Sequence, residues 1–459
     1  MLKASLSKRR ADSLGISATG FRQRFLQHLS SQHLGAQLRQ QRKRKQRTDT
    51  KISSIGMIMG RVYHFMQAGG TAATHVEQVT GRKISESQVS RRCRAIGVKI
   101  FEWVMGEVLG PRADPRRESD AFYRGMRLVG LDGTMFSMFN TPSILKTLSK
   151  AVSRRMKAAF AKVGVVCLVE LGTHRPMAAV IAHQQEGEIT LAMRLVGQTP
   201  AGCLLLADRL YGVGKFLVAF LKSFMDGQSD FLVRVRKGSF NRRRIKKHRD
   251  GSVLWEIWGT DPEGGKQLFL AREIRGVVIG RGGHRTSLRL WTSLLDAQLY
   301  PAQELIKLYL QRWEQEISFK ELKIHLHGGA PLQSCTPETG CQEIASLLIA
   351  QALLADLRLE ASRRGEVPIL RISFLKVLHH VTALWEVFSW GGEVLSEKQR
   401  SQTIQGMFGS LLRQLSPPRR ARSCPRVVRQ PIGPWPRKLK NGGDSHGEFH
   451  YEISGKIRK

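Results

Sequence analysis

The chain has 459 residues, of which 41% are hydrophobic, so it is long enough for about three domains and can bury a sizeable core. This content excludes a disordered polycation, although 74 Lys and Arg against 37 Asp and Glu give a net charge of +37. So basic a protein attracts polyanions, and nucleic acid is the commonest of them because each neutralised phosphate releases counterions. A solubilising surface or an anionic membrane is the alternative explanation.

The cysteines are scattered and form no Cys-x-x-Cys pair, which favours free, buried thiols over a disulfide scaffold. They are Cys93, Cys167, Cys203, Cys335, Cys341 and Cys424. A metal cluster of Cys335 and Cys341 with His325 and His327 is the less favoured alternative. The N-terminus has no continuous apolar core, and the best apolar stretch, from Leu347 to Ala355, is too short to span a bilayer. We therefore expect a cytoplasmic protein without membrane contact.

The first 120 residues are predicted to be mostly helical and basic. A dense basic run occupies residues 42–47. Farther on, the sequence predicts a helix, a turn centred on Gly81 and a second helix capped by Ser85. The second helix would carry three arginines, namely Arg91, Arg92 and Arg94. A helix-turn-helix that inserts them into a DNA major groove and an ordinary hairpin with a solvated basic face both fit this pattern.

From about Arg127 the sequence consists of short apolar runs bounded by Gly, Pro and Asp, which are typical of a largely buried sheet. Two of these runs, RLVGLD and CLLLAD, end on the acids Asp132 and Asp208. The runs VGVVCLVELG and PMAAVIAH predict two more strands between them. We expect Asp132 to end its strand because Gly133 and Thr134 let the backbone turn away.

Residues 237–298 are predicted to form a β-rich insertion. The segment FLVRVRKG leads into a very basic loop, NRRRIKKHRDG, and strands follow around SVLWEIWG, KQLFLAREI and SLRLWTSLL. A strong helix begins after Tyr300, with Pro301 in its first turn. Further helices are expected from Pro337 to Arg364 and from Ile372 to Phe388. The tail after Ser401 is rich in Pro and Arg and is predicted to be an extended arm that tracks phosphates.

Three acids fit the requirements of phosphodiester cleavage by two divalent metal ions held on a rigid frame. Asp132 and Asp208 close their strands, and Glu316 lies inside the strong helix. Magnesium prefers hard oxygen ligands and keeps positions open for phosphate, so two or three carboxylates suffice. A strand-terminal Asp is also a common turn former, and the helix is therefore the more informative element.

One polar stripe of that helix holds four side chains, namely Tyr309, Arg312, Glu316 and Lys323. At about 100° per residue they fall within an arc of roughly 60°. A solvated, salt-bridged face would explain Arg312 and Glu316 alone. A helix that faces phosphates would carry the whole set: Glu for a metal ion, Arg and Lys for phosphate charge, and Tyr as a hydroxyl donor.

The segment YLQRWEQEISFKELK carries the signature Tyr-x2-Arg-x3-Glu-x6-Lys and so resembles the insertion sequence 4 family of DDE transposases. LDGT at 131–134 and ADRLYG at 207–212 are similar to that family's contexts for its first two catalytic aspartates. RRARSCPRVVRQPIGPWPRK at 419–438 is similar to the family's basic C-terminal segment. One departure is Leu210, because the position after Asp-Arg is often small in such enzymes.

The resemblance implies that three acids bind catalytic Mg2+, for which Mn2+ substitutes, namely Asp132, Asp208 and Glu316. It implies that three further side chains contact DNA phosphates near the cleaved end, namely Tyr309, Arg312 and Lys323. The implied fold is α/β, an RNase H-like mixed sheet flanked by helices, with a β-rich insertion before the last catalytic helix and a helical N-terminal domain.

Five segments follow from this reading. They are a helical DNA-end-binding domain at 1–120, the first part of the catalytic core at 121–236, the β-rich insertion at 237–298, the second part of the core at 299–400, and a basic C-terminal arm at 401–459. The gap between Asp208 and Glu316 agrees with an insertion, because a bare strand-to-helix connection needs far fewer residues.

The resemblance also implies a cut-and-paste DNA transposase of the bacterial nucleoid, acting as a homodimer on double-stranded terminal inverted repeats and on target DNA. A hairpin intermediate requires a sharply bent end, which a flipped base stacked on an aromatic side chain relieves. Three tryptophans of the insertion are candidates, namely Trp255, Trp258 and Trp291, and a place in the core is the favoured alternative for each of them. The rival hypotheses are a nuclease of the same fold that never joins DNA, a catalytically inactive DNA-binding descendant, and a packaging protein.

Overall fold

The computed structural model describes most of the chain. The described residues are 18–29, 52–67, 69–152, 157–223, 229–236, 238, 241–261, 263–279, 283, 285–391, 394–418, 422–423, 445–446 and 450–453. The basic run at 42–47 and, apart from Arg422 and Ser423, the segment at 419–438 lie outside them.

Contacts within the chain divide it into two compact units, each made of three stretches of sequence. The first unit comprises Met1–Ala121, Gly133–Leu195 and Gln315–Ser416. The second unit comprises Phe122–Asp132, Val196–Glu314 and Pro417–Lys459. The five segments expected from the sequence stay a prediction.

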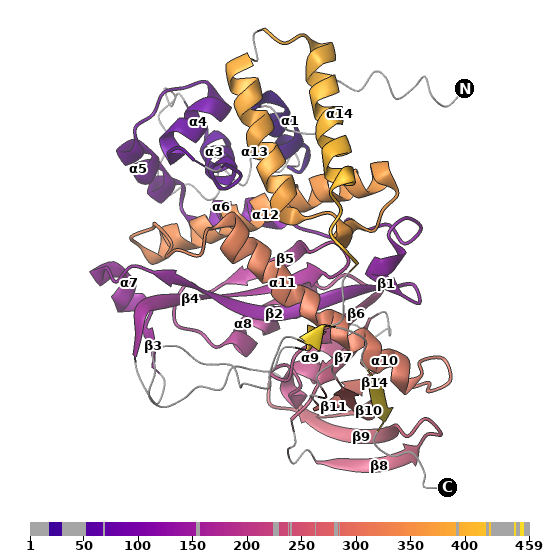
Figure 1. The fold of residues 1–459 in the computed structure, drawn as a ribbon. Helices are drawn as coiled ribbons and strands as arrows, with labels where there is room; N and C mark the ends of the chain where they lie inside the picture. Colours follow the sequence, from indigo (N-terminus) through magenta and orange to yellow (C-terminus); the bar gives the residue numbers. More distant parts are fainter. Residues whose placement is uncertain are drawn as a thin grey trace. The chain divides into compact units, whose positions relative to one another are not determined.

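The first unit is a layer of helices on a short sheet. Its main helices are α1 (Ala18–Gln27), α3 (Ser54–Phe65), α4 (Ala72–Thr80), α5 (Glu86–Ile96), α6 (Val98–Val108), α12 (Pro337–Gly365), α13 (Phe374–Gly391) and α14 (Glu397–Arg413). Helix α12 is buried along nearly its whole length and packs against α3, α6 and α13 (Figure 1). The helices predicted from Pro337 and from Ile372 are thus confirmed, with small shifts at their ends.

Local capping explains the hairpin near the start of this unit. Helix α4 ends at Gly81, whose φ of +67° suits glycine, and Ser85 begins α5 in a capping box with Gln88. The predicted pair of helices is therefore confirmed. Arg91 and Arg94 on α5 are exposed, whereas the half-buried Arg92 donates to the carbonyl oxygen of Ile52.

The sheet of the first unit contains the second half of β2 (Met126–Met138), β4 (Lys157–Glu170), β3 (Lys150–Val152) and β5 (Arg175–Ile181). Strand β4 lies next to β2 and pairs with β3 and β5. Two short helices, α7 (Pro142–Thr147) and α8 (Glu188–Leu195), follow β2 and β5, and α8 packs on β4 and β5. Apolar side chains fill the faces of β4 and β5, as the two predicted strands require.

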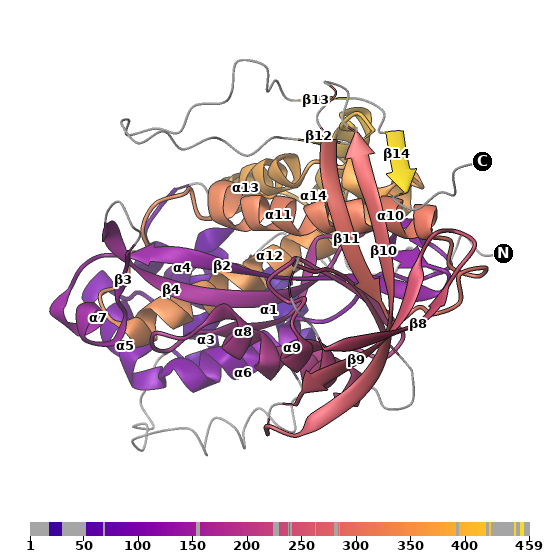
Figure 2. The same cartoon turned by 90° about the horizontal axis from the view of Figure 1, so that it is seen from below.

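The second unit is built on a larger sheet (Figure 2). Its strands, in order, are the first half of β2, β6 (Cys203–Ala207), β7 (Asp230–Arg234), β11 (Arg285–Thr292), β10 (Lys266–Ile279), β9 (Val253–Thr260) and β8 (Arg242–Lys247). The pairs β2–β6 and β6–β7 are parallel, and the pairs from β7 to β8 are antiparallel. Strand β1 (Phe122–Tyr123) pairs with β2, β14 (His450–Ile453) pairs with β10, and the two helices are α9 (Gly214–Ser223) and α10 (Ala302–Tyr309).

The remaining elements are short. They are the 3-10 turns η1 (Ser119–Ala121), η2 (Val196–Gln198), η3 (Leu310–Arg312) and η5 (Ile369–Arg371), helix α11 (Trp313–Lys320), the π-helical turn η4 (Glu321–Leu326), and the strand pair β12 (Arg422–Ser423) and β13 (Ser445–His446).

The expected fold class, a mixed sheet flanked by helices, is confirmed. Hydrogen-bonded neighbours follow the order β5-β4-β2-β6-β7, which is the strand order of an RNase H-like sheet. Every described helix is too short or too polar to span a bilayer. Cys93, Cys167, Cys203 and Cys341 are free and buried as expected, whereas Cys335 is free and exposed.

Four local predictions were wrong. The tail is not extended from Ser401 onward, because helix α14 continues to Arg413. Asp132 does not end its strand, because β2 continues to Met138 beside β4 after its pairing with β6 stops. The basic loop contains strand β8, an edge strand whose cations after Arg242 are exposed. The strong helix is not regular, because the 3-10 turn η3 and the π turn η4 interrupt it. The ideal arc calculated for the polar stripe therefore does not apply.

Candidate active site

Parallel pairing places the two aspartates at equivalent positions of neighbouring strands. The register of β2 and β6 pairs Leu131 with Ala207 at its last step, so Asp132 and Asp208 are the next residue on each strand. Strand β6 ends there, whereas β2 continues beside β4, so the two aspartates lie where the parallel β2–β6 pairing stops. The Asp132 side chain is 20% exposed and the Asp208 residue is half-buried, so both carboxylates reach solvent.

The turn after β6 is fixed by its own hydrogen bonds. Oδ1 of Asp208 accepts from the backbone N–H of Leu210, and the Asp208 carbonyl accepts from that of Tyr211 at 3.2 Å. The aromatic ring of Tyr211 is fully buried. A Cβ at Gly212 would lie 2.4 Å from the carbonyl oxygen of Arg234 on β7, so only glycine fits there. Leu210 is thus compatible with a well-formed turn.

Helix α10 and turn η3 bring two members of the Tyr-Arg-Glu-Lys signature to these aspartates. The hydroxyl of Tyr309 donates to the carbonyl oxygen of Ala207 at 3.3 Å, and burial raises the pKa of Tyr309 to about 12. Nη1 of Arg312 lies 3.8 Å from Oδ2 of Asp132. Tyr309, Arg312 and the two aspartates all belong to the second unit.

Glu316 lies four residues beyond Arg312, on α11, and belongs to the first unit. The helical segment after it is anchored by buried polar side chains. Nε2 of Gln351 donates to the carbonyl oxygen and to Oγ of Ser318, both at 3.0 Å. Oε2 of Glu321 accepts from Nδ1 of His174 at 2.9 Å. These contacts join the segment to α12 and to the β4–β5 turn.

The anchored segment ends in the π turn that carries Lys323. Oε1 of Glu321 lies 3.3 Å from Nη1 of Arg358, so this buried carboxylate is paired on both sides. Nζ of Lys323 donates to the carbonyl oxygen of Met135 at 2.9 Å and to Oγ1 of Thr134 at 3.3 Å. Burial lowers the pKa of Lys323. Inserted π turns are frequent at functional sites.

The donor set suits a hard divalent cation, although the described residues include no group of three His, Cys, Asp or Glu side chains close enough to hold one. Of the two carboxylate oxygens of Asp208, Oδ1 accepts a hydrogen bond from the described residues and Oδ2 accepts none. The lone pairs of Oδ2 thus remain for a ligand. Carboxylate oxygens are the ligands that Mg2+ prefers. Arg312 partly compensates the charge of Asp132, and because their ion pair is long, a metal cation can displace the guanidinium.

Comparisons with known proteins identify the family. Residues 123–352, half of the chain, match the Transposase DDE domain model. The chain belongs to the DDE transposase family. This transposase is 26% identical over 326 residues to the transposase InsG of insertion sequence element IS4 from Escherichia coli strain K12, covering 68% of the chain and 69% of the relative. The resemblance to the insertion sequence 4 family is thereby confirmed.

A comparison of folds finds the piggyBac transposase synaptic complex with hairpin DNA, solved by cryo-electron microscopy. That structure has a TM-score of 0.42 and 9% identity, with 86% of this chain and 84% of that chain covered. The family assignment means that the chain is a DNA transposase with nuclease and transesterase chemistry. Enzymes of this family act on DNA and use divalent metal ions.

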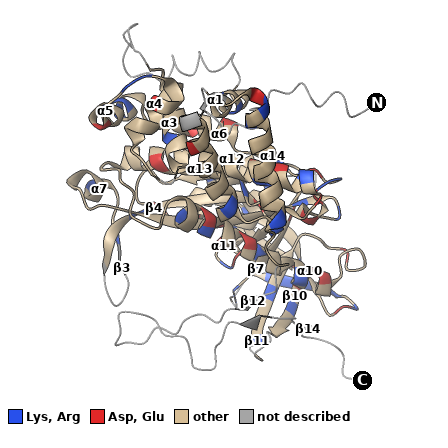
Figure 3. Ribbon diagram, turned by 45° about the horizontal axis from the view of Figure 1, so that its top comes forward, with Lys and Arg blue, Asp and Glu red and all other residues tan. Residues whose placement is uncertain are grey.

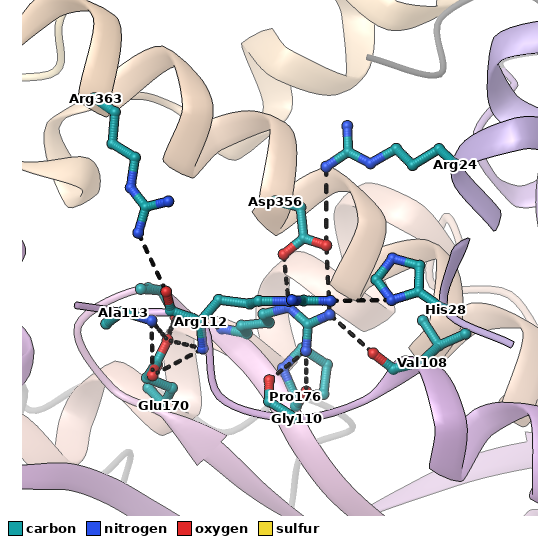
Figure 4. A network of polar contacts seen from close by, with 12 residues as sticks. Arg24, His28, Val108, Gly110, Arg112, Ala113, Glu170, Pro176, Asp356 and Arg363 are labelled. Atoms are coloured by element: carbon teal, nitrogen blue, oxygen red, sulfur yellow. Dashed lines mark hydrogen bonds and ion pairs between the residues drawn. The ribbon is translucent and has the colours of Figure 1, made fainter. Parts of the chain in front are cut away.

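The β4–β5 turn of the transposase is held by a buried ionic network (Figure 4). Arg175 pairs with Asp356 at 2.7 Å and donates to the carbonyl oxygens of Val108 and Gly110. Glu170 is fully buried and accepts from the backbone N–H groups of Arg112 and Ala113. The turn between Glu170 and Arg175 contains His174, at a φ of +59°. This network therefore fixes the residue that holds Glu321.

Strands β8 to β11 of the transposase surround a carboxylate at the centre of a basic cluster. Oxygens of the buried Glu273 lie 2.7 Å from the guanidinium groups of three residues on β8, β10 and β11, namely Arg242, Arg275 and Arg289. Figure 3 shows basic positions along β10 in this sheet. Nε1 of Trp291 also donates to Glu273, at 3.0 Å, and its ring is fully buried.

The three candidate tryptophans differ in access. Trp291 belongs to the core, and Trp255 is half-buried beneath Arg242, whose Cζ lies 4.0 Å from the ring centroid. Trp258 is 37% exposed. Exposure thus favours Trp258 as a ring that can stack on a base.

Sequence reasoning missed the residues that support the helix. No local pattern marks His174, Glu321 and Arg358, because Glu321 lies 147 residues from His174 and 37 residues from Arg358 along the chain. Gly212 had a signal, as the last residue of ADRLYG, but its reason is a close approach of β7 that only the fold reveals.

Proposed function

We propose that this transposase cleaves and joins element ends with a catalytic triad of Asp132, Asp208 and Glu316. The observation that carries the proposal is the β2–β6 register, which sets the two aspartates side by side where this parallel pairing stops. The third acid, Glu316, lies on the helical segment that carries the Tyr-Arg-Glu-Lys signature, called the signature helix below. It is four residues after Arg312, which contacts Asp132. Two acids where a parallel strand pair stops and one acid on a helix can supply the carboxylates that two-metal phosphoryl chemistry uses.

The three carboxylates would hold Mg2+, or Mn2+ in its place. When bound, the metal ions lower the pKa of the attacking water or hydroxyl and stabilise the leaving oxygen. The chain's own residues do the rest. Arg312 neutralises Asp132 before binding and offers its guanidinium to a DNA phosphate once the metal takes its place. The Tyr309 hydroxyl holds the backbone that presents Asp208.

We propose that Arg312 and Lys323 contact phosphates near the cleaved end. Both are cationic, half-exposed and carried by the signature helix or its π turn. Tyr309 is the third residue of the predicted contact set, and its donor is occupied by Ala207 in the absence of DNA. Its contribution to a phosphate contact therefore requires that this hydrogen bond be exchanged or shared.

The proposed route is cut and paste on double-stranded terminal inverted repeats, carried out by a homodimer that pairs two ends. Hydrolysis of one strand frees a 3′-hydroxyl, which attacks the opposite strand to form a hairpin. The hairpin is reopened, and the 3′ end then attacks a target phosphodiester. The exposed ring of Trp258 is the proposed stacking partner for a flipped base at the hairpin.

The test is incubation of the full chain with a labelled DNA end and a target plasmid, with Mg2+ and with EDTA. Metal-dependent nicking, a hairpin and plasmid joining support the proposal. Asp132→Asn, Asp208→Asn and Glu316→Gln should each abolish nicking while the affinity for the end stays within about twofold, because each change removes a metal ligand and no phosphate contact. Normal cutting by any of them refutes the assignment of that residue, and nicking without joining favours a nuclease.

A further inference from the structure

Two lysine side chains meet along the second half of β2, all within the first unit. Nζ of Lys323, from the π turn, donates to Met135 and Thr134, and Nζ of Lys162, from β4, donates to Oγ of Ser137 at 2.6 Å. The positive charge of Lys162 acts with burial to lower the pKa of Lys323, so the two ammonium groups are electrostatically coupled. Elements far apart in the sequence thus bring two cations to one strand.

These two cations have no acidic partner among the described residues. Lys162 and Lys323 contact only hydroxyl and carbonyl oxygens of the strand, together with the ring of Phe136 in the case of Lys323. Elsewhere in the same unit, Arg175 is paired with the carboxylate of Asp356 and Arg363 with that of Glu118. Two like charges that are half-buried without a counter-charge destabilise the free protein. An anionic ligand bound between them would remove this destabilisation.

The hydrogen-bonding capacity of the pair also points to an anion. An ammonium group has three donors and no acceptor. Lys323 uses two of its donors and Lys162 uses one, so three N–H groups remain for a ligand. The non-bridging oxygens of a phosphodiester accept from such donors and supply the missing negative charge.

We propose that Lys162 and Lys323 together form a clamp for one DNA phosphodiester beside the cleaved position. This rests on the proposed function, and the new assignments are Lys162 and the sharing of one phosphate. Met135 and Ser137 lie three and five residues beyond Asp132 on β2, which spans about 10 to 17 Å in an extended strand. The clamp thus holds a phosphate that flanks the scissile one and sets the register of the DNA end.

Lysine footprinting tests the clamp without cleavage. The full chain is acylated with an amine-reactive ester in EDTA, alone and with a duplex end, and the labelled lysines are read by mass spectrometry. We expect the duplex to protect Lys162 and Lys323 together, and inorganic phosphate at matched ionic strength to protect neither. Exposure of Lys162 in the complex overturns the proposal, and equal protection by free phosphate shows an adventitious anion site and overturns it too.

Binding measurements supply the second arm. Lys162→Met should reduce the slope of log K against log salt by about one, the change for one lost phosphate contact. Lys376→Met is the matched control, because Lys376, like Lys162, donates to one uncharged oxygen, in its case the carbonyl oxygen of Gln414 at 3.1 Å. In the double variant Lys162→Met/Lys323→Met, sharing of one phosphate predicts a smaller loss than the two single losses combined.

An unchanged slope in Lys162→Met, or strict additivity in the double variant, refutes the shared clamp. Failure of the proposed function is distinguishable, because it appears as absent nicking by the unaltered chain in Mg2+, whatever the footprint in EDTA shows.

Discussion

The hydroxyl of Tyr309 donates to the carbonyl oxygen of Ala207, the residue that immediately precedes Asp208. The signature helix and the strand that carries an acid are therefore joined by a side chain to backbone hydrogen bond. The ring is buried, and burial is the largest cause of the raised pKa of its hydroxyl. Tyr309 stays protonated, and so remains a donor, at any pH at which DNA cleavage is measured.

Tyr309→Phe should therefore slow cleavage more than it weakens DNA binding. The variant leaves a buried carbonyl without its donor, at a cost of about 1 kcal/mol, and loosens the backbone beside Asp208. Single-turnover nicking and end affinity are the measurements. A rise in Kd with an unchanged cleavage rate would instead assign the hydroxyl to a phosphate.

Gly212→Ala should destabilise the second unit and reduce cleavage. Its new methyl group would meet the carbonyl oxygen of Arg234, a backbone atom, and overpacking of this kind costs about 1 to 3 kcal/mol. Gly197→Ala is the control, because a Cβ there meets nothing within 4 Å. The denaturant midpoint of each variant is the measurement, and that of Gly212→Ala should be lower. Equal midpoints would show that β7 shifts to accommodate the methyl group at little cost.

Glu321→Gln should lower the cleavage rate while the isosteric side chain keeps the packing. The change removes the charge that holds His174 and Arg358 and so frees the π turn that presents Lys323. Glu118→Gln is matched to it, because Glu118 is also buried and pairs with Arg363 of the same helix α12. The two variants should lose similar stability, and only Glu321→Gln should lose nicking. Equal nicking rates would make Glu321 a purely structural residue.

The parts of the fold that the sequence predicts are those with a local cause. Apolar runs that end in Asp predict β6 and its acid, and Ser85 with Gly81 predicts the limits of α4 and α5. The prediction that the strand ends at Asp132 was wrong because a strand can change its pairing partner without a break. Its continuation depends on pairing with β4 and not on the Gly-Thr that follows Asp132. The π turn is equally non-local, since buried contacts of Glu321 accompany it.

Substitution by alanine should distinguish a structural tryptophan from a DNA-stacking tryptophan in the predicted insertion. Trp291→Ala removes a fully buried ring bound to Glu273 and should cost about 3 to 5 kcal/mol. Trp258→Ala should change stability by less than about 0.5 kcal/mol, as at other partly exposed positions. If Trp258 stacks on a flipped base, its loss reduces the hairpin and spares the first nick. A normal hairpin yield in Trp258→Ala would exclude it.

Acidification should destabilise the first unit through a pair of histidines. The Nδ1 atoms of His64 and His75 lie 2.8 Å apart, and burial lowers the pKa of His64 to about 4 and also lowers that of His75. Arg61 opposes protonation of His64 as well, whereas Glu86 and Glu343 favour it. Because the unfolded rings bind protons from about pH 6.5, stability is full above that pH and falls as the pH drops toward 4.

The measurement is the melting temperature between pH 7.5 and pH 5. His64→Asn should flatten this dependence, by up to about 1.4 kcal/mol per pH unit for the proton that it removes. An identical slope in the variant would mean that other groups cause the acid sensitivity.

Strand β8 ends the sheet of the second unit, and five of its six residues, RRRIKK, are cationic. A second copy of this strand could approach in register only by bringing like charges within the spacing of about 4.8 Å between paired strands. The edge thus discourages fibrillar self-association while the protein is free. Neutralisation by a polyanion at low salt removes that barrier, so the chain is most prone to precipitate with DNA near charge equivalence.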